Sequence, residues 1–192
     1  GILEKSNIEY YFSDVSSFFI TTAKAKYQHP NIKFGIYNID EDYRKQGLLP
    51  NMFDLIIAVE VVENAKNIPY TMQMLKELIA PKGWLVLSES VIEPAWILAS
   101  QAFLMQEPQD DLRKNTSYLG QSDWIKLLME IGEGDMYSWP EQGSSIDSFG
   151  IRLFAKQVKK QMPHYDLNEI KDGLKKELAG YMIPSNMQVI DS

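Results

Sequence analysis

The run FDLIIAV at residues 53–59 constrains the fold of this chain more than any other stretch. A continuous apolar run with a single acidic residue predicts a strand buried on both faces, as in a parallel sheet covered by helices. Apolar residues at helical spacing follow over residues 67–80, and the run WLVLSE at 84–89 predicts the next strand. A strand, a helix and a second strand in this order indicate a βαβ unit.

A similar unit precedes this one in the sequence. Residues 8–14 and 32–39 are rich in β-branched and aromatic side chains and predict strands, and residues 15–27 predict a helix between them. Further along, residues 122–132 predict a helix, and a final strand at 149–158 is compatible with an antiparallel hairpin at the sheet edge. The expected fold class is therefore α/β, a doubly wound sheet with helices on both faces.

A change of composition after residue 160 predicts two domains. Residues 161–166 read as a linker, and the helix predicted after it has one apolar face, formed by Leu167, Ile170, Leu174 and Leu178. We expect a larger domain at 1–160 and a small helix-containing appendage at 161–192. Within the larger domain, residues 94–106 predict one more helix.

Composition excludes several kinds of site. The net charge of −7 disfavours nucleic acid and membrane surfaces as partners. The chain has no cysteine, and its two histidines, His29 and His164, lie far apart, so we expect no metal site. The longest apolar runs are shorter than the roughly 20 residues that cross a bilayer. We expect a cytoplasmic protein, and Gly1 in place of methionine indicates a cut or excised start.

Five segments in a fixed order carry a resemblance to a known family. They are YYFSDVSSFF at 10–19, QG at 46–47, FDLIIAVEVV at 53–62, IAPKGWLVLSE at 79–89 and DWIKLLMEIG at 123–132. Together they resemble the S-adenosylmethionine-dependent, class I methyltransferase domains of polyketide and nonribosomal peptide synthetases. The resemblance covers most of residues 7–158 and implies a Rossmann-like sheet.

The same resemblance implies that the sheet is truncated. In the family, a glycine-rich cofactor turn and the first strand lie just before the segment that matches IEYYFSD, and we expect both to be absent from this chain. The missing strand would be the central one. We expect strand 8–13 to lie beside strand 53–59, or the gap to be filled by another chain.

The resemblance also places the cofactor contacts at strand ends. Asp14 matches the acid that binds the ribose hydroxyls, although Asp14 equally suits the N-cap of the next helix. Asn38 stands where the family has the acid that recognises adenine. Asn38, Ile39 and Glu60 complete the expected set of cofactor-binding residues.

Two further acids match catalytic positions of the family. Glu63 stands where many carbon-methylating members have a histidine base, and Glu89 matches a carboxylate that orients this histidine. Glutamate has an unperturbed pKa near ~4.3, against ~6.5 for histidine, and is the weaker base. Two facing acids would also raise the pKa of one of them. We favour the interpretation that Glu60 and Glu63 are solvated loop charges.

The tail resembles a different domain. LAGYMIP at 178–184 is similar to a motif in the C-terminal part of nonribosomal adenylation domains, with Ala179 where that family has proline. The two resemblances together imply a piece of a nonribosomal peptide synthetase. Its partners would be the neighbouring adenylation and carrier-protein domains.

Two functions stay open at this point, and the sequence leaves undecided whether the chain is an enzyme. One is a degenerate methyltransferase-fold domain with a structural or docking role and no cofactor. The alternative is an active N- or O-methyltransferase that uses S-adenosylmethionine on a carrier-bound aminoacyl or acyl group. An unrelated nucleotide-binding domain is disfavoured, because no phosphate-binding loop is present.

Overall fold

The computed structural model describes residues 7–93, 107–114, 116–160 and 166–187, and residues 95 and 99 singly. Nearly all of the helix predicted at 94–106 lies outside these residues. The chain divides into two compact units, Gly1–Lys160 and Gln161–Ser192.

The first unit alternates strands and helices as predicted. Its elements are β1 (Tyr10–Asp14), α2 (Ser17–Lys26), β2 (Ile32–Ile36), η1 (Tyr43–Gln46), β3 (Phe53–Val59), η2 (Val62–Asn64), α3 (Ile68–Leu78), β4 (Ile79–Ser90), α5 (Gln121–Glu130), β5 (Met136–Trp139), η3 (Asp147–Phe149) and β6 (Ile151–Gln157).

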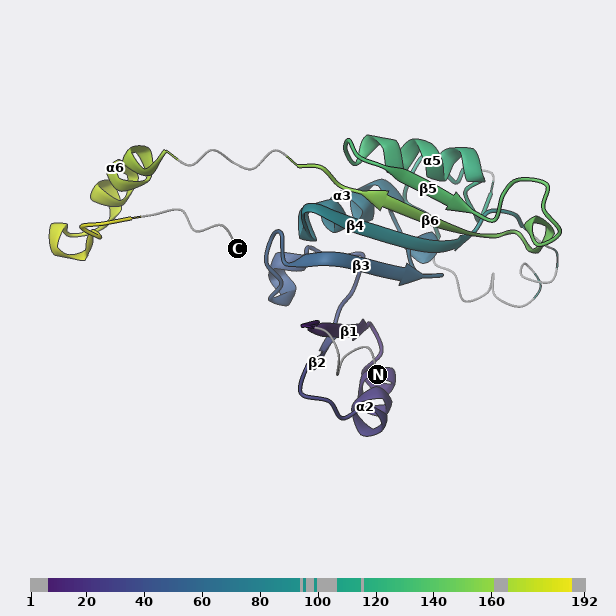
Figure 1. Cartoon of the computed structure of the whole chain (residues 1–192), viewed down its shortest axis with the longest axis horizontal. Helices are drawn as coiled ribbons and strands as arrows, with labels where there is room; N and C mark the ends of the chain where they lie inside the picture. Colours follow the sequence, from purple (N-terminus) through teal and green to yellow (C-terminus); the bar gives the residue numbers. More distant parts are fainter. Residues whose placement is uncertain are drawn as a thin grey trace. The chain divides into compact units, whose positions relative to one another are not determined.

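The strands form two separate sheets (Figure 1). β1 and β2 form a parallel pair. The other sheet has the order β3-β4-β6-β5, in which β3 is parallel to β4 and β6 is antiparallel to both of its neighbours. The β5–β6 hairpin lies at the edge of this sheet, in agreement with the sequence analysis.

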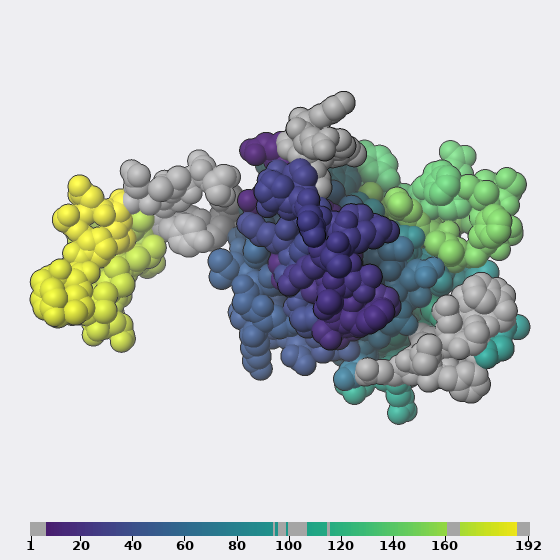
Figure 2. Space-filling view, turned by 90° about the horizontal axis from the view of Figure 1, so that it is seen from below, coloured from purple at the N-terminus to yellow at the C-terminus, as the bar shows by residue number. Residues whose placement is uncertain are grey.

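The prediction that strand 8–13 lies beside strand 53–59 is wrong, because β1 pairs with β2 and not with β3. β1 approaches β3 through side chains, and the rings of Tyr11 and Phe53 lie 5.8 Å apart between centroids. Seen from below, the purple surface of β1, α2 and β2 lies in front of the blue surface of β3 (Figure 2). That another chain fills the gap between β1 and β3 stays a prediction.

Helices α3 and α5 bury one face of the four-stranded sheet. Leu85 and Leu87 of β4 project from this face into the core, together with Phe154 of β6. Trp124 of α5 is fully buried and packs against Phe154, with 6.3 Å between ring centroids. Burial of these large side chains supplies the main favourable term for this unit.

Lys82 in β4 has a left-handed backbone, with φ of 67°. A side chain there strains the backbone, because Cβ crowds the following carbonyl oxygen. We expect Lys82→Gly to stabilise the chain by about 0.5–1 kcal/mol, net of the added freedom of the unfolded chain. Urea unfolding measures the change. Lys82→Ala keeps Cβ and is the matched control, so an equal gain in both variants would contradict the strain argument.

The second unit consists of α6 (Leu167–Glu177) and η4 (Gly180–Met182). The Asp166 side chain caps α6 by accepting a hydrogen bond from the Asn168 amide at 2.8 Å. No residue of either helix is buried.

Candidate functional site

A cavity of about 890 Å³ lies outside the carboxyl ends of β1, β2 and β3. Open α/β sheets bind their ligands at this position, because loops diverge where the chain reverses its direction across the sheet. The polar residues that line the cavity come from three segments: Ser13 and Asp14, then Asn38 and Asp40, then Glu60, Asn64 and Lys66. The parallel strands therefore bring the predicted cofactor-binding residues to one place.

Asp14 is not the N-cap of α2, and its role in binding the ribose hydroxyls stays a prediction. One carboxylate oxygen accepts a hydrogen bond from the Ser16 amide at 2.7 Å and shapes the turn into α2. The N-cap residue itself is Ser16. Asp14 also lines the cavity, so its carboxylate is placed to meet a ligand there.

Asn38 and Ile39 line the neighbouring part of the cavity. The Asn38 side-chain oxygen accepts from the Asp40 amide at 3.0 Å, and its nitrogen donates to Glu41 at 3.2 Å. Gln46 accepts from the Asn38 amide at 2.7 Å and fixes the backbone. The Asn38 side chain is thus engaged in its own turn, while Ile39 packs against the core.

Tyr37 is a cavity residue that the sequence analysis did not single out. Its hydroxyl is buried and has no hydrogen-bond partner among the described residues. Burial raises the pKa of Tyr37 to about 12, so the phenol keeps its proton at neutral pH. A buried hydroxyl without a partner is uncommon and offers one donor for a ligand.

Glu60 directly follows β3 and has a left-handed backbone conformation, with φ of 51°. Its amide donates to the Ser88 carbonyl at 2.7 Å, and its own carbonyl accepts from the Asn64 side chain at 2.9 Å. The Glu60 side chain is exposed and borders the cavity, as expected of a solvated loop charge. Non-glycine residues with a strained backbone conformation of this kind are concentrated at active sites and ligand sites.

Glu63 is buried, so its interpretation as a solvated loop charge is wrong. Only 4% of Glu63 and none of Glu89 is exposed. The Glu89 carboxylate accepts from the amides of Val62 and Glu63, both at 3.2 Å, and the Glu63 carboxylate accepts from the Ser90 amide at 2.7 Å. The two acids thereby join η2 to β4.

The acid pair carries a proton at neutral pH. Burial, and then the neighbouring Glu63 charge, raise the pKa of Glu89 to about 8. Burial also raises the pKa of Glu63. The cavity is lined by Val62 and Asn64 on either side of Glu63, but not by Glu63 itself. The catalytic roles assigned to Glu63 and Glu89 stay predictions.

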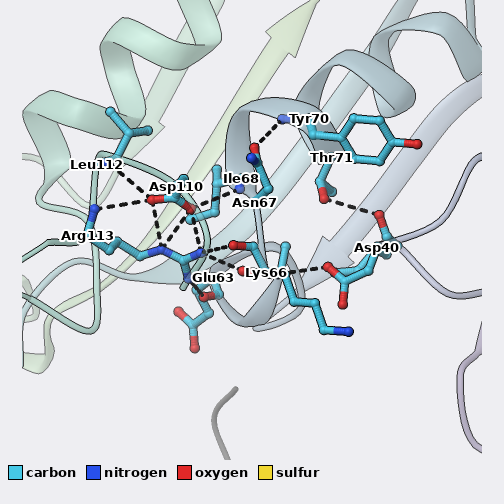
Figure 3. Close-up of polar contacts among 12 residues, drawn as sticks. Asp40, Glu63, Lys66, Asn67, Ile68, Tyr70, Thr71, Asp110, Leu112 and Arg113 are labelled. Atoms are coloured by element: carbon cyan, nitrogen blue, oxygen red, sulfur yellow. Dashed lines mark hydrogen bonds and ion pairs between the residues drawn. The ribbon is translucent and has the colours of Figure 1, made fainter. Parts of the chain in front are cut away.

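A buried ion pair holds the same turn from its other side (Figure 3). Arg113 pairs with Asp110 at 2.6 Å, and only 1% and 2% of the two side chains are exposed. The guanidinium donates to the carbonyls of Glu63 at 2.7 Å, Ala65 at 2.5 Å and Lys66 at 3.3 Å. Asp110 also accepts from the Ile68 amide at 3.1 Å, at the start of α3.

Arg113 was not among the predicted site residues, because the surrounding run QEPQDDLRKNTS reads as a polar loop. The spacing of Asp110 and Arg113, three residues apart, was the available signal for an ion pair. Asp40 completes the support of the turn, since its carboxylate accepts from the Lys66 amide at 2.7 Å (Figure 3). Charged side chains therefore brace the turn that borders the cavity.

The described part of the chain holds neither a cluster of metal-binding side chains nor a membrane-spanning helix. No group of three or more histidine, cysteine, aspartate or glutamate side chains there is arranged to hold a metal ion. None of the helices in that part is both long and apolar enough to cross a membrane.

Comparisons with known proteins point to one family. Residues 2–132 match the family described as "Methyltransferase domain". Pyochelin synthetase PchF of Pseudomonas aeruginosa is 25% identical over 189 residues, which are 97% of this chain and 10% of that protein. Probable polyketide synthase 41 of Dictyostelium discoideum is 33% identical over 140 residues, 67% of this chain and 5% of that protein.

Solved structures agree with these relatives. The CurJ carbon methyltransferase matches with a TM-score of 0.71 and 26% identity, covering 79% of this chain and 42% of that one. The DszA carbon methyltransferase matches with a TM-score of 0.70 and 25% identity, covering 81% and 41%. This chain spans a tenth or less of the length of these two curated relatives.

Proposed function

Since this chain belongs to the methyltransferase domain family, we propose that it is a degenerate methyltransferase-fold domain of a nonribosomal peptide synthetase, with a structural or docking role. Similar proteins carry the domain within long synthetases, which supports this setting. Pyochelin synthetase matches nearly the whole chain, including the tail.

One observation carries the proposal of a role without catalysis. The resemblance would put Glu63 at the position of the family's base, yet its carboxylate is buried and accepts from the Ser90 amide, and it does not line the cavity. A general base must come within hydrogen-bond reach of the proton that it removes. Glu89 holds a proton at neutral pH and is fully buried, so it offers no second base.

Titration with S-adenosylmethionine tests this proposal. We expect calorimetry on the purified 192-residue chain to show no saturable binding at micromolar concentrations of the cofactor. Circular dichroism on the same sample verifies that the chain is folded. Saturable micromolar binding would contradict the degenerate role.

An active N- or O-methyltransferase is the second candidate, and the cavity favours it. Asp14, Asn38, Ile39 and Glu60 all line the cavity, so these residues fit S-adenosylmethionine, which would supply the methyl group. Asp14 would accept from the ribose hydroxyls and Asn38 from the adenine amine. If binding is observed, Asp14→Ala should weaken it about tenfold, the loss of one charge-assisted hydrogen bond.

The role of the second unit is also a proposal. α6 and the LAGYMIP segment would form a fragment of an adenylation domain, with the neighbouring adenylation and carrier-protein domains of the same synthetase as partners. The exposure of α6 supports this assignment. None of its residues is buried, and an amphipathic helix needs another surface to cover its apolar face. A cytoplasmic location is likewise proposed, on the composition of the chain alone.

A further inference from the structure

The carboxyl groups of Glu63 and Glu89 are hydrogen-bonded to each other. An ionised carboxylate only accepts hydrogen bonds, so this bond exists only while one of the two acids holds a proton. Glu89 carries the proton, and its O–H donates to the Glu63 carboxylate. One shared proton therefore holds the Glu63 side chain against β4.

The cationic side chains around the pair are engaged elsewhere. The guanidinium of Arg113 donates to the backbone carbonyl of Glu63 and forms its ion pair within its own loop. On β6, Arg152 lies opposite Glu89 in the strand register, but its guanidinium pairs with Asp147. The described residues form no ion pair with either carboxyl group of the acid pair.

The remaining titratable groups described around the pair are acids and phenols. Burial and, to a smaller extent, the charge of Glu60 raise the pKa of Glu63. Burial and the charge of Glu63 raise the pKa of Tyr118, so this phenol is neutral. Tyr70 of α3 is exposed and lies near Tyr37. Loss of the shared proton would therefore leave two uncompensated negative charges in a buried site, which is costly.

Glu63 is the freer of the two acids. Glu89 lies within β4, which has a partner strand on each side. Glu63 belongs to the three-residue turn η2, and its neighbours Val62 and Asn64 already line the cavity. Rotation toward the cavity would return the Glu63 carboxylate to water, and Glu89 has no comparable route.

The backbone of η2 stays held when the side chain of Glu63 moves. Its carbonyl at this residue accepts from Arg113 at 2.7 Å (Figure 3). The amides of Val62 and Glu63 donate to the Glu89 carboxyl group, and ionisation of the acceptor strengthens such bonds. Rotation of one side chain is therefore the smallest change that separates the two charges, and it also breaks the hydrogen bond from the Ser90 amide.

We infer that the shared proton is a latch that keeps Glu63 out of the cavity, and that its loss to solvent frees the side chain to turn its carboxylate into the cavity. Opening becomes more favourable as the pH rises, because the closed form keeps a proton that the open form has lost. The pKa of Glu89, raised by burial to about 8, makes the effect complete at mildly alkaline pH. The latch is a property of these side chains and does not require that S-adenosylmethionine binds.

Hydrogen exchange at single-residue resolution on the 192-residue chain tests the latch. The Ser90 amide donates to the Glu63 carboxylate at 2.7 Å and reports its position. The protection factor of this amide should fall about tenfold for each pH unit between 6 and 8, because opening releases one proton. The fall should be nearly independent of low urea concentrations, because a side-chain rotation exposes little surface. The amide of Leu87, inside β4, is the internal control and should be better protected and respond to urea.

Glu89→Gln is the variant that separates the proton from the hydrogen bond. Its side-chain amide can donate to Glu63 and has no proton to lose in this interval, so the pH dependence at Ser90 should disappear. Glu60→Gln is the matched control. It removes a neighbouring charge and keeps the acid pair, so the pH dependence at Ser90 should remain.

A second measurement identifies which side chain moves. A neutral gadolinium chelate broadens the NMR signals of groups that lie at the solvent-exposed surface. The side-chain methylene signals of Glu63 should broaden more at pH 8.5 than at pH 6, and those of Glu89 should not change. Broadening of the Glu89 signals in place of the Glu63 signals would contradict the inferred direction of movement.

Two results of the exchange experiment would overturn the inference. Equal protection and equal urea dependence at Ser90 and Leu87 would mean that the acid pair separates only when the whole unit unfolds. A pH dependence at Ser90 that persists in Glu89→Gln would exclude the shared proton as its cause. Titration with S-adenosylmethionine is a separate readout, since binding would refute the non-catalytic role and leave both of these results interpretable.

Discussion

Arg113→Met is expected to destabilise the first unit by about 3–5 kcal/mol, because it leaves the buried Asp110 carboxylate without its partner. The change also deprives the carbonyls of Glu63, Ala65 and Lys66 of a donor. Urea unfolding followed by circular dichroism measures the loss. A loss of this size is a large fraction of the free energy of unfolding of an ordinary domain, which is about 5–15 kcal/mol.

Lys114→Met is the matched control for Arg113→Met. Lys114 pairs with Asp111 at 2.8 Å, but both side chains are mostly exposed, so its loss should change stability by no more than about 0.5 kcal/mol. The double variant Asp110→Leu, Arg113→Met removes both charges and should recover part of the loss. Equal stability of the Arg113→Met and Lys114→Met proteins would refute the bracing role of the buried pair.

Stability should fall as the pH rises from about 5 to about 8. The pKa of Glu89 is raised to about 8 in the folded chain, against 4.5 in an unperturbed glutamate. In this interval the folded state keeps a proton that the unfolded state has lost, so unfolding becomes more favourable as the pH rises. The expected decrease in the free energy of unfolding is about 2–4 kcal/mol. Burial of Glu63 acts in the same direction.

Unfolding by urea at several pH values between 5 and 8.5 measures this dependence. Glu89→Gln should flatten it, because the amide carries no proton to lose in this interval. The same variant should be less stable at pH 5. The glutamine side chain has one oxygen to accept the two hydrogen bonds that the backbone amides of Val62 and Glu63 donate to Glu89 in the parent chain. Glu130→Gln, at an exposed site on α5, should keep the slope of the parent chain. An unchanged slope in Glu89→Gln would exclude Glu89 as its source.

The architecture was accessible from the sequence where the pattern is local. Strand β3 has the predicted bounds 53–59, because a continuous apolar run needs no distant partner to identify it. The predicted burial of this strand on both faces is wrong, since Leu55, Ile57 and Val59 are exposed on one of them. Asp14, Asn38, Ile39 and Glu60 were expected to lie together because the family resemblance places the cofactor contacts at strand ends, and all four line one cavity.

The remaining features depend on contacts between distant segments. Glu63 looked like a loop charge because nothing near it in sequence shows that Glu89 and Ser90, about 26 residues away, enclose it. Arg113 reaches carbonyls 47 to 50 residues away from within a polar run. The pairing of β1 also required knowledge of which backbone groups are available beside it, and no local pattern contains that information.

The division of the sheet has a consequence for how the first unit opens. Among the described residues, no ladder of backbone hydrogen bonds joins β1, α2 and β2 to the four-stranded sheet. Segments without such coupling detach at a lower free energy than the global transition and form their own cooperative subunit, or foldon. Residues 10–36 would therefore open, and become available to proteases, while β3, β4, β6 and β5 stay assembled.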